Sequence, residues 1–275
     1  MGGWVTFPGG QFERDPGSAV SDAPSYDWPL RRWVPVGSAS ISPDGTKYVA
    51  SDGSTFFLVD VVTGKRRPIF STPGNRAVVD YTSEGVYLAD PGGQNPRQEP
   101  GLWLLDPAIG NVRLIPGSEQ SAGWQLVSRG VAWALPSSSH SVLRLDLRSG
   151  QIDTWYRFPT SVALQSVSLR TMDAGGQPLV SVYPPYPQSE PSQFGLITGR
   201  DQFQELQVPV PAFKAYLAQP GIWLTLNRGA DIELYTPEKG VILLSTATHI
   251  LGVAGGCFDA ANNPPLGALW RAVGD

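Results

Sequence analysis

Polar side chains recur near one position of a repeated strand pattern. Side chains of these types are the candidates for catalytic residues. His249 and Lys214 occupy the same position in the first strands of two successive copies. Asp80 and Gln125 lie two residues deeper along the first strand of two earlier copies. A general acid or base needs a partner positioned within hydrogen-bonding reach. The spacing shows no such pair, so we interpret the four residues as polar groups lining a water-filled channel.

A second set of candidates consists of Asp and Asn residues where the second strand of a copy runs into its following loop. Oxygen ligands of this kind from several copies can hold Ca²⁺, but Asp and Asn are also the ordinary residues of such turns. We favour the turn interpretation, because these strand ends would lie away from a central axis, and calcium is kept as the alternative. The residues are Asp52, Asp90, Asn227 and Asn262.

The other reactive residue types are few. Cys257 is the only cysteine, which leaves no intramolecular disulfide and no cysteine-based zinc site. Other copies carry an aliphatic residue at its position, so we predict that Cys257 is buried and unreactive. His140 falls in a serine-rich loop and is expected at the surface. The chain has no nucleophile elbow, phosphate-binding loop or dinucleotide fingerprint.

Short strands separated by tight turns must position these candidates. In the stretch 40–64, Pro43-Asp44-Gly45 predicts a first turn, since proline fixes φ and glycine accepts a positive φ. Thr63-Gly64 predicts a second turn. Degenerate copies follow at spacings of roughly 40 to 50 residues. Each copy reads as strand, tight turn, strand, variable loop, strand, tight turn, strand, which predicts a four-stranded antiparallel meander.

Six copies account for most of the chain, which we interpret as one all-β domain of 275 residues. The copies cover 36–70, 76–115, 123–158, 163–208, 213–244 and 250–273. The last copy lacks a strand, because Ile250–Ala260 supplies its first two and Leu266–Val273 its third. We predict that the N-terminal strand Gly3–Phe7, within 3–12, pairs with Leu266–Val273 as the outer strand and so covers an exposed edge. Residues 14–35 would then lie outside the repeats.

Composition supports this fold and excludes several classes of protein. The chain has 31 Gly, 26 Pro and only 16% charged residues, as expected where many short strands need many turns. A net charge of −4 argues against binding driven by a nucleic-acid backbone. No run approaches the ~20 apolar residues of a membrane span, and no signal-peptide segment opens the sequence. Low lysine content and nine Trp favour an extracytoplasmic bacterial protein, with a cytoplasmic location as the alternative.

Ser42-Pro43-Asp44-Gly45, followed by an aromatic residue and then by Asp60-x-x-Thr63-Gly64, resembles the WD40-like repeats of TolB-type six-bladed β-propellers. Similar repeats occur in the propeller domains of prolyl-oligopeptidase-type peptidases. The resemblance implies a six-bladed β-propeller of four-stranded antiparallel blades, with the ring closed by the N-terminal strand in the last blade. It also implies a role in protein contacts or in gating a separate enzyme domain. It supplies no catalytic residue, because propellers host many unrelated functions.

The loops are longest on one face, called here the top face, which carries the connections between second and third strands and between successive blades. Two of these loops, 91–100 and 183–191, are rich in proline. Long loops on one face of a repeat fold often mark a binding face, and Tyr, Trp and Arg are enriched among binding hot spots. The predicted binding residues are Trp28, Asn95, Arg97, Tyr183 and Tyr186.

The sequence therefore favours a binding or scaffolding propeller, rather than an enzyme, that recognises a protein, peptide or glycan on its top face. No cofactor and no nucleic acid are expected in this interpretation. One alternative is a Ca²⁺-dependent hydrolase of lactone or ester substrates with its site in the central channel. Another is the propeller half of a larger enzyme or receptor.

Overall fold

The structure is a computed structural model, and its described residues fall into two compact units. It describes residues 2–6, 12–15, 25–27, 30, 32–72, 74, 76–90, 100–136, 140–159, 167–173, 176–182, 193–206, 214–218, 221–226, 231–236, 240–246, 250–253 and 269–274. Unit 1 comprises 1–38, 181–195 and 205–275, and unit 2 comprises 39–180 and 196–204.

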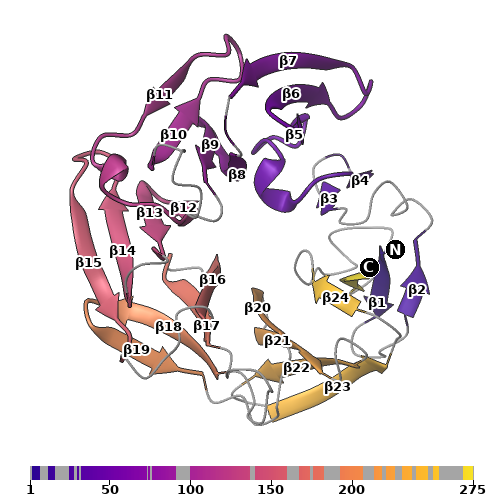
Figure 1. The fold of residues 1–275 in the computed structure, drawn as a ribbon. Helices are drawn as coiled ribbons and strands as arrows, with labels where there is room; N and C mark the ends of the chain where they lie inside the picture. Colours follow the sequence, from indigo (N-terminus) through magenta and orange to yellow (C-terminus); the bar gives the residue numbers. More distant parts are fainter. Residues whose placement is uncertain are drawn as a thin grey trace. The chain divides into compact units, whose positions relative to one another are not determined.

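Antiparallel strands make up almost all the regular structure of unit 2, as Figure 1 shows. The first sheet has three strands, β5 (Lys47–Asp52), β6 (Thr55–Asp60) and β7 (Arg66–Ser71). The second sheet is the meander β8 (Ala77–Thr82), β9 (Gly85–Ala89), β10 (Leu102–Leu105) and β11 (Val112–Leu114). The third sheet is the meander β12 (Trp124–Ser128), β13 (Val131–Ala134), β14 (Ser141–Asp146) and β15 (Ile152–Arg157).

A fourth meander is formed by β16 (Val167–Met172), β17 (Pro178–Val182), β18 (Gln193–Gly199) and β19 (Gln202–Glu205). In unit 1, a fifth is formed by β20 (Lys214–Ala218), β21 (Gly221–Leu226), β22 (Asp231–Thr236) and β23 (Gly240–Thr246). Two 3-10 turns, η2 (Ser38–Ser40) and η3 (Ser118–Gln120), are the helical segments among the described residues. The prediction of an all-β chain built from four-stranded antiparallel sheets is confirmed.

The first sheet departs from the four-strand pattern at its beginning. Only Ile41 pairs with β5, through an isolated bridge to Tyr48, so the expected first strand is reduced to one residue. The chain before it forms a separate hairpin, β3 (Ser25–Asp27) with β4 (Arg32–Val34). The indole Nε1 of Trp33 donates to Asp15 Oδ2 at 2.7 Å. Part of the segment expected outside the repeats is therefore ordered as paired strands.

The second sheet is buried on both faces, and this explains its two continuous apolar strands. Every residue of β9 and β10 is buried. Alternate residues enter two clusters: Tyr87 packs with Trp124 of the third sheet, whereas Leu88 packs with Phe56 of the first sheet. A strand covered on both faces needs no polar alternation. The first three sheets are thus held face to face by apolar side chains.

The two ends of the described chain meet in one sheet of unit 1, the terminal sheet. Its order is β2 (Phe12–Arg14), β1 (Gly2–Thr6), β25 (Leu269–Gly274), β24 (Ile250–Val253). The predicted pairing of the N-terminal strand with the C-terminal strand is confirmed, with Val5 opposite Trp270.

Two details of the predicted terminal sheet are wrong. The N-terminal segment supplies two strands rather than one, because β2 pairs with the free side of β1 and becomes the outer strand. In addition, β25 lies directly beside β24. It is therefore the second strand of this sheet, whereas Ile250–Ala260 was expected to supply both the first and the second.

Candidate functional site

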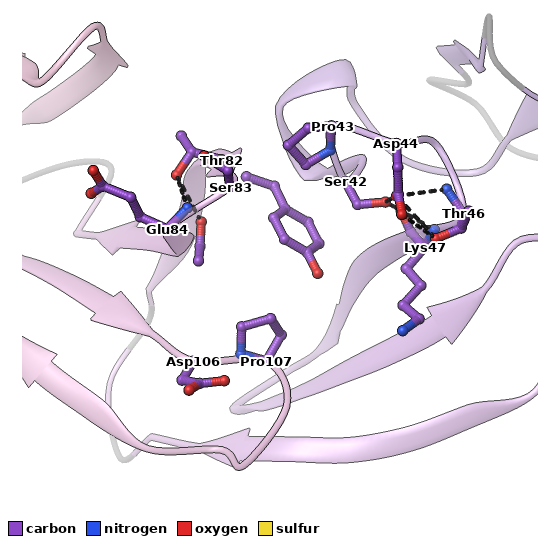
Figure 2. Close-up of a pocket in the computed structure, with 12 residues that line it drawn as sticks. Ser42, Pro43, Asp44, Thr46, Lys47, Thr82, Ser83, Glu84, Asp106 and Pro107 are labelled. Atoms are coloured by element: carbon purple, nitrogen blue, oxygen red, sulfur yellow. Dashed lines mark hydrogen bonds between the residues drawn. The ribbon is translucent and has the colours of Figure 1, made fainter.

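A polar recess of about 470 Å³ opens between the first and second sheets of unit 2. Figure 2 shows that its walls are tight turns and not long loops. These turns join first to second strands and third to fourth strands, so the recess lies on the face opposite to the predicted top face. Its lining residues come from three segments: Ser42, Pro43, Asp44, Thr46 and Lys47; Tyr81, Thr82, Ser83, Glu84 and Gly85; Asp106 and Pro107.

The first wall is the predicted Pro-Asp-Gly turn, and hydrogen bonds hold its carboxylate in place. Gly45 has φ of 71°, which is the left-handed conformation that glycine tolerates. Asp44 Oδ1 accepts from the Ser42 hydroxyl at 2.6 Å and from the Thr46 backbone N–H at 3.0 Å. The Ser42 hydroxyl, followed by the donors of Thr46, lowers the pKa of Asp44. The turn therefore presents a fixed negative charge at neutral pH.

The second wall carries a tyrosine whose ring is half-buried at the end of β8. Burial raises the pKa of Tyr81 first, and the charge of Asp44 raises it further. Asp106 acts in the same direction and Arg67 opposes it. The phenol thus lies in the electrostatic field of carboxylates from both sheets. Next to it, Glu84 accepts a hydrogen bond from the Tyr87 hydroxyl at 2.7 Å.

The third wall is the turn from β10 to β11, which begins at Asp106. Its carboxylate Oδ1 accepts from the Ala108 backbone N–H at 2.8 Å. The guanidinium of Arg67, on β7 of the first sheet, donates to the Pro107 carbonyl at 2.6 Å and the Ala108 carbonyl at 3.1 Å. This contact fastens the turn of the second sheet onto the first sheet. The separation between the walls of the recess is therefore set by direct hydrogen bonds.

Two of the four predicted channel residues have described side chains. Asp80 lies in β8 beside a register shift between Val78 and Asp80, and burial raises its pKa to about 6. Gln125 is half-buried in β12, next to a second register shift. Lys214 begins β20, whereas His249 lies outside the described residues. The structure describes no contact among these four residues.

Two of the four weak metal candidates are described, and both lie at strand ends. Asp52 is exposed at the end of β5 and Asp90 is half-buried after β9. Asn227 and Asn262 lie outside the described residues. Within the described part of the chain, no group of three His, Cys, Asp or Glu side chains could hold a metal ion.

The predicted top-face residues are not described, and neither is the lone cysteine. Trp28, Asn95, Arg97, Tyr183, Tyr186 and Cys257 all lie outside the described residues. His140, expected at the surface, is half-buried, and its carbonyl accepts the Phe158 backbone N–H at 2.7 Å. This hydrogen bond extends the pairing of β14 with β15 and draws the histidine against the sheet.

The sequence analysis did not predict the recess, because each of its residues is typical of a tight turn when its own copy is considered alone. Asp44 belongs to a standard turn motif, and Asp106 occupies the same turn position as Asp60 and Asp146. The available signal was their place in neighbouring copies. When two copies stand side by side, the turns that join equivalent strands lie at the same edge, and their polar residues converge.

The sequence matches no protein-family profile and no curated protein. Among solved structures, an oligogalacturonate lyase in complex with manganese matches with a TM-score of 0.54 and 10% identity, over 79% of this chain and 68% of that one. The acylaminoacyl peptidase of Pyrococcus horikoshii matches with a TM-score of 0.54 and 13% identity, over 82% and 41%. TolB from Acinetobacter baumannii matches with a TM-score of 0.42 and 16% identity, over 71% and 50%.

The chain thus spans about two fifths of that peptidase and half of that TolB. At these identities the matches concern the fold alone. No helix among the described residues is long and apolar enough to cross a membrane. The resemblance of the chain to β-propellers, indicated by the turn motif at 42–45, is confirmed at the level of the fold.

Proposed function

We propose that this chain is a binding module that recognises a protein, peptide or glycan and carries out no chemistry on it. The observation that carries the proposal is the recess between the first and second sheets. Three turns and the first residue of β5 line about 470 Å³ of space with hydroxyl, carboxylate and ammonium groups. Polar groups fixed in advance by the fold lose little entropy when a ligand binds. A recess of this construction suits recognition.

The top-face loops form a second part of the same proposal. Trp28, Asn95, Arg97, Tyr183 and Tyr186 supply an aromatic rim with one cation, a composition that is common at binding hot spots. We place the partner outside the cytoplasm, as the composition favours. The predicted strand pattern assigns the two surfaces to opposite faces, so a variant of one should leave binding at the other intact.

Affinity capture from an extract of the source organism, followed by cross-linking and mass spectrometry, tests the proposal. The baits are the wild type, the top-face double variant Tyr186→Ala/Arg97→Ala, and the recess variant Asp106→Asn. We expect one cross-linked partner to be lost from one variant, with affinity lowered by about 1 to 2 kcal/mol and the melting temperature unchanged. Equal recovery of every partner by all three baits would contradict the proposal, as would turnover of a lactone or ester panel by the wild type.

A further inference from the structure

Three groups that line the recess keep hydrogen-bonding capacity that the rest of the described chain does not use, and they define what a ligand must offer. The Tyr81 hydroxyl takes part in no hydrogen bond among the described residues, and the Lys47 ammonium makes neither a hydrogen bond nor an ion pair there. Asp106 uses Oδ1 for the Ala108 N–H, while its Oδ2 accepts nothing from the described residues. A ligand can therefore bond to a carboxylate, a phenol and an ammonium group without displacing an existing contact.

The recess is electrostatically negative despite its lysine. Asp44, Glu84 and Asp106 line it together with the cation Lys47, while the guanidinium of Arg67 at the third wall is bonded to the Pro107 and Ala108 carbonyls. Lys47 stands opposite Asp60, outside the recess, in the pairing of β5 with β6. Hydrogen bonds from Thr63 are the main cause that lowers the pKa of Asp60, and the charge of Lys47 acts in the same direction. The negative charge of Asp60, outside the recess, thus offsets part of the positive charge of Lys47. The unbalanced charge inside the recess favours a cation.

The ring of Tyr81 adds a shape requirement to the charge. An aromatic face next to a carboxylate suits a planar cation, because a guanidinium can stack on the ring while its N–H groups bond to the carboxylate oxygens. The exposed ammonium of Lys47 suits a carbonyl oxygen on the same ligand. A peptide offers both groups, since its backbone carbonyls flank each side chain.

We propose that the recess binds the guanidinium of an arginine within an extended peptide segment of the partner. This inference rests on the proposed binding function and names the chemistry of one of its two surfaces. Asp106 pairs with the guanidinium, Tyr81 supports it with its ring and hydroxyl, and Lys47 donates to a backbone carbonyl of the peptide. Arginine is also one of the residues most enriched at protein interfaces.

The test is isothermal titration calorimetry of the full chain with short capped peptides. The probes are acetyl-Gly-Arg-Gly-amide, its citrulline analogue, its lysine analogue, and free methylguanidinium. Citrulline preserves the shape of arginine and removes its charge. Methylguanidinium shows whether the cation alone suffices without the peptide carbonyls.

The matched variants are Asp106→Asn and Asp146→Asn, which change the same position of the same turn in neighbouring sheets. Asp146 does not line the recess, and its carboxylate accepts from the Arg148 and Ser149 backbone N–H groups. An Asn side chain can still accept the turn hydrogen bond, and a thermal melt of each variant confirms that it is folded. Tyr81→Phe removes only the phenol hydroxyl.

We expect saturable binding of the arginine peptide, about tenfold weaker with Asp106→Asn and unchanged with Asp146→Asn. Binding should weaken as the ionic strength rises from about 0.05 to about 0.5 M, and Tyr81→Phe should weaken it several-fold. Absence of saturation by the arginine peptide would overturn the inference, as would equal affinity for the citrulline peptide or saturation by Ca²⁺ or an oligosaccharide instead. Such a failure would leave the top-face part of the proposed function standing, because no top-face residue takes part in this test.

Discussion

At the residue scale, equivalent turn positions carry the same residue type with different surroundings. Asp60 and Asp146 each begin a turn in which a Thr or Ser hydroxyl, at Thr63 or Ser149, donates back to the carboxylate. The backbone N–H groups and hydroxyls of these turns lower the pKa of both carboxyls. In the second sheet the equivalent residue is Ile109, which is 74% exposed and offers no hydroxyl. Asp106 is thereby left available to a ligand.

Asp80 gives a pH-dependence prediction at the same scale. Burial raises its native pKa from 3.8 to about 6, so the native state holds this proton more tightly than the unfolded state. Its contribution to stability is complete below about pH 4 and is lost as the pH rises through 6. Asp80→Asn should raise the free energy of unfolding at pH 7.5 by about 1 to 2 kcal/mol, a value reduced for partial exposure.

Urea unfolding of the wild type and of Asp80→Asn at pH 4.5 and 7.5 measures this effect. The difference between the two proteins should be small at pH 4.5 and larger at pH 7.5. Asp52→Asn, at the exposed end of β5, serves as the control and should change neither value. If Asp80→Asn lost stability at pH 7.5, the Asp80 carboxylate would be making a favourable contact in its charged form.

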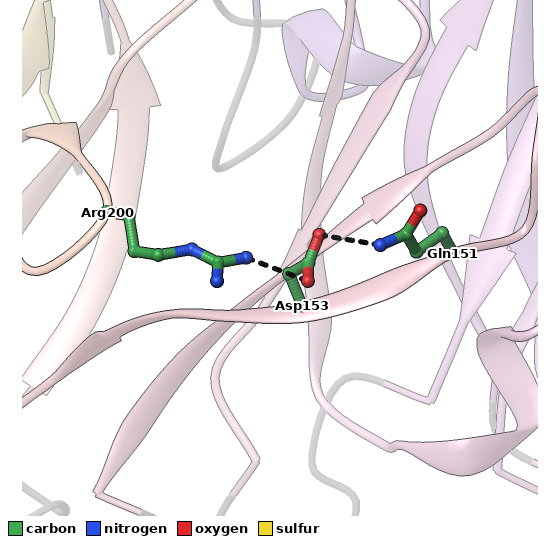
Figure 3. A network of polar contacts seen from close by, with 3 residues as sticks. All are labelled: Gln151, Asp153 and Arg200. Atoms are coloured by element: carbon green, nitrogen blue, oxygen red, sulfur yellow. Dashed lines mark hydrogen bonds and ion pairs between the residues drawn. The ribbon is translucent and has the colours of Figure 1, made fainter.

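At the scale of elements, the second, third and fourth sheets each rest the turn between their last two strands on the end of the sheet before. A Cβ on Gly110 would clash with the Ile69 carbonyl oxygen of β7. A Cβ on Gly150 would lie 2.9 Å from the Pro116 carbonyl oxygen beyond β11. Between β18 and β19, Asp201 donates its N–H to the Trp155 carbonyl at 2.7 Å. Figure 3 shows Arg200 of that turn pairing with Asp153 of β15 at 2.8 Å.

The turn glycines supply a matched pair of variants. Gly64 and Gly110 occupy the same turn position, with φ of 67° and 77°. A Cβ on Gly64 meets nothing within 4 Å, whereas on Gly110 it meets backbone. Gly64→Ala should cost about 1 kcal/mol for the positive φ alone, and Gly110→Ala about 2 to 4 kcal/mol because the sheets must separate.

Chemical denaturation of the two variants measures the difference between their free energies of unfolding. Because both positions have a positive φ, this difference reports the contact between the turn and β7 and not the backbone strain. Equal destabilisation by both substitutions would show that the turn of the second sheet does not rest on β7. A larger loss for Gly64→Ala would contradict the account of both turns.

At the scale of the whole molecule, the sequence predicted the class of fold but not the recess between the first and second sheets. The turn glycines and Asp residues of the copies are local signals, so they revealed the strand pattern and even the pairing of the two chain ends. The recess depends on which turns become neighbours once the sheets pack. That packing follows from the apolar side chains of β9 and β10, which enter one cluster on each face of the second sheet. The additional strand β2 was not predicted, because its three residues, Phe12–Arg14, are too few to show a periodic pattern.

Removing residues 1–14 tests the contribution of the N-terminal strands. The deletion strips β1 and β2 from the terminal sheet and leaves the edge of β25 unpaired. Unpaired edges template association with other chains. We expect a lower melting temperature and multimers in size-exclusion chromatography. A monomeric deletion variant with an unchanged melting curve would contradict the pairing.

The central claim about the fold is that both ends of the chain build one sheet, in the order β2-β1-β25-β24. Disulfide trapping in a Cys257→Ser background tests it most directly. Paired residues of adjacent antiparallel strands lie within bridging distance, and the register places Val5 opposite Trp270 and Trp4 opposite Arg271. At least one of the double variants Val5→Cys/Trp270→Cys and Trp4→Cys/Arg271→Cys should form a reducible intramolecular bond on mild oxidation. If both pairs formed no more disulfide than the mismatched control Val5→Cys/Ala272→Cys, the result would contradict the claim.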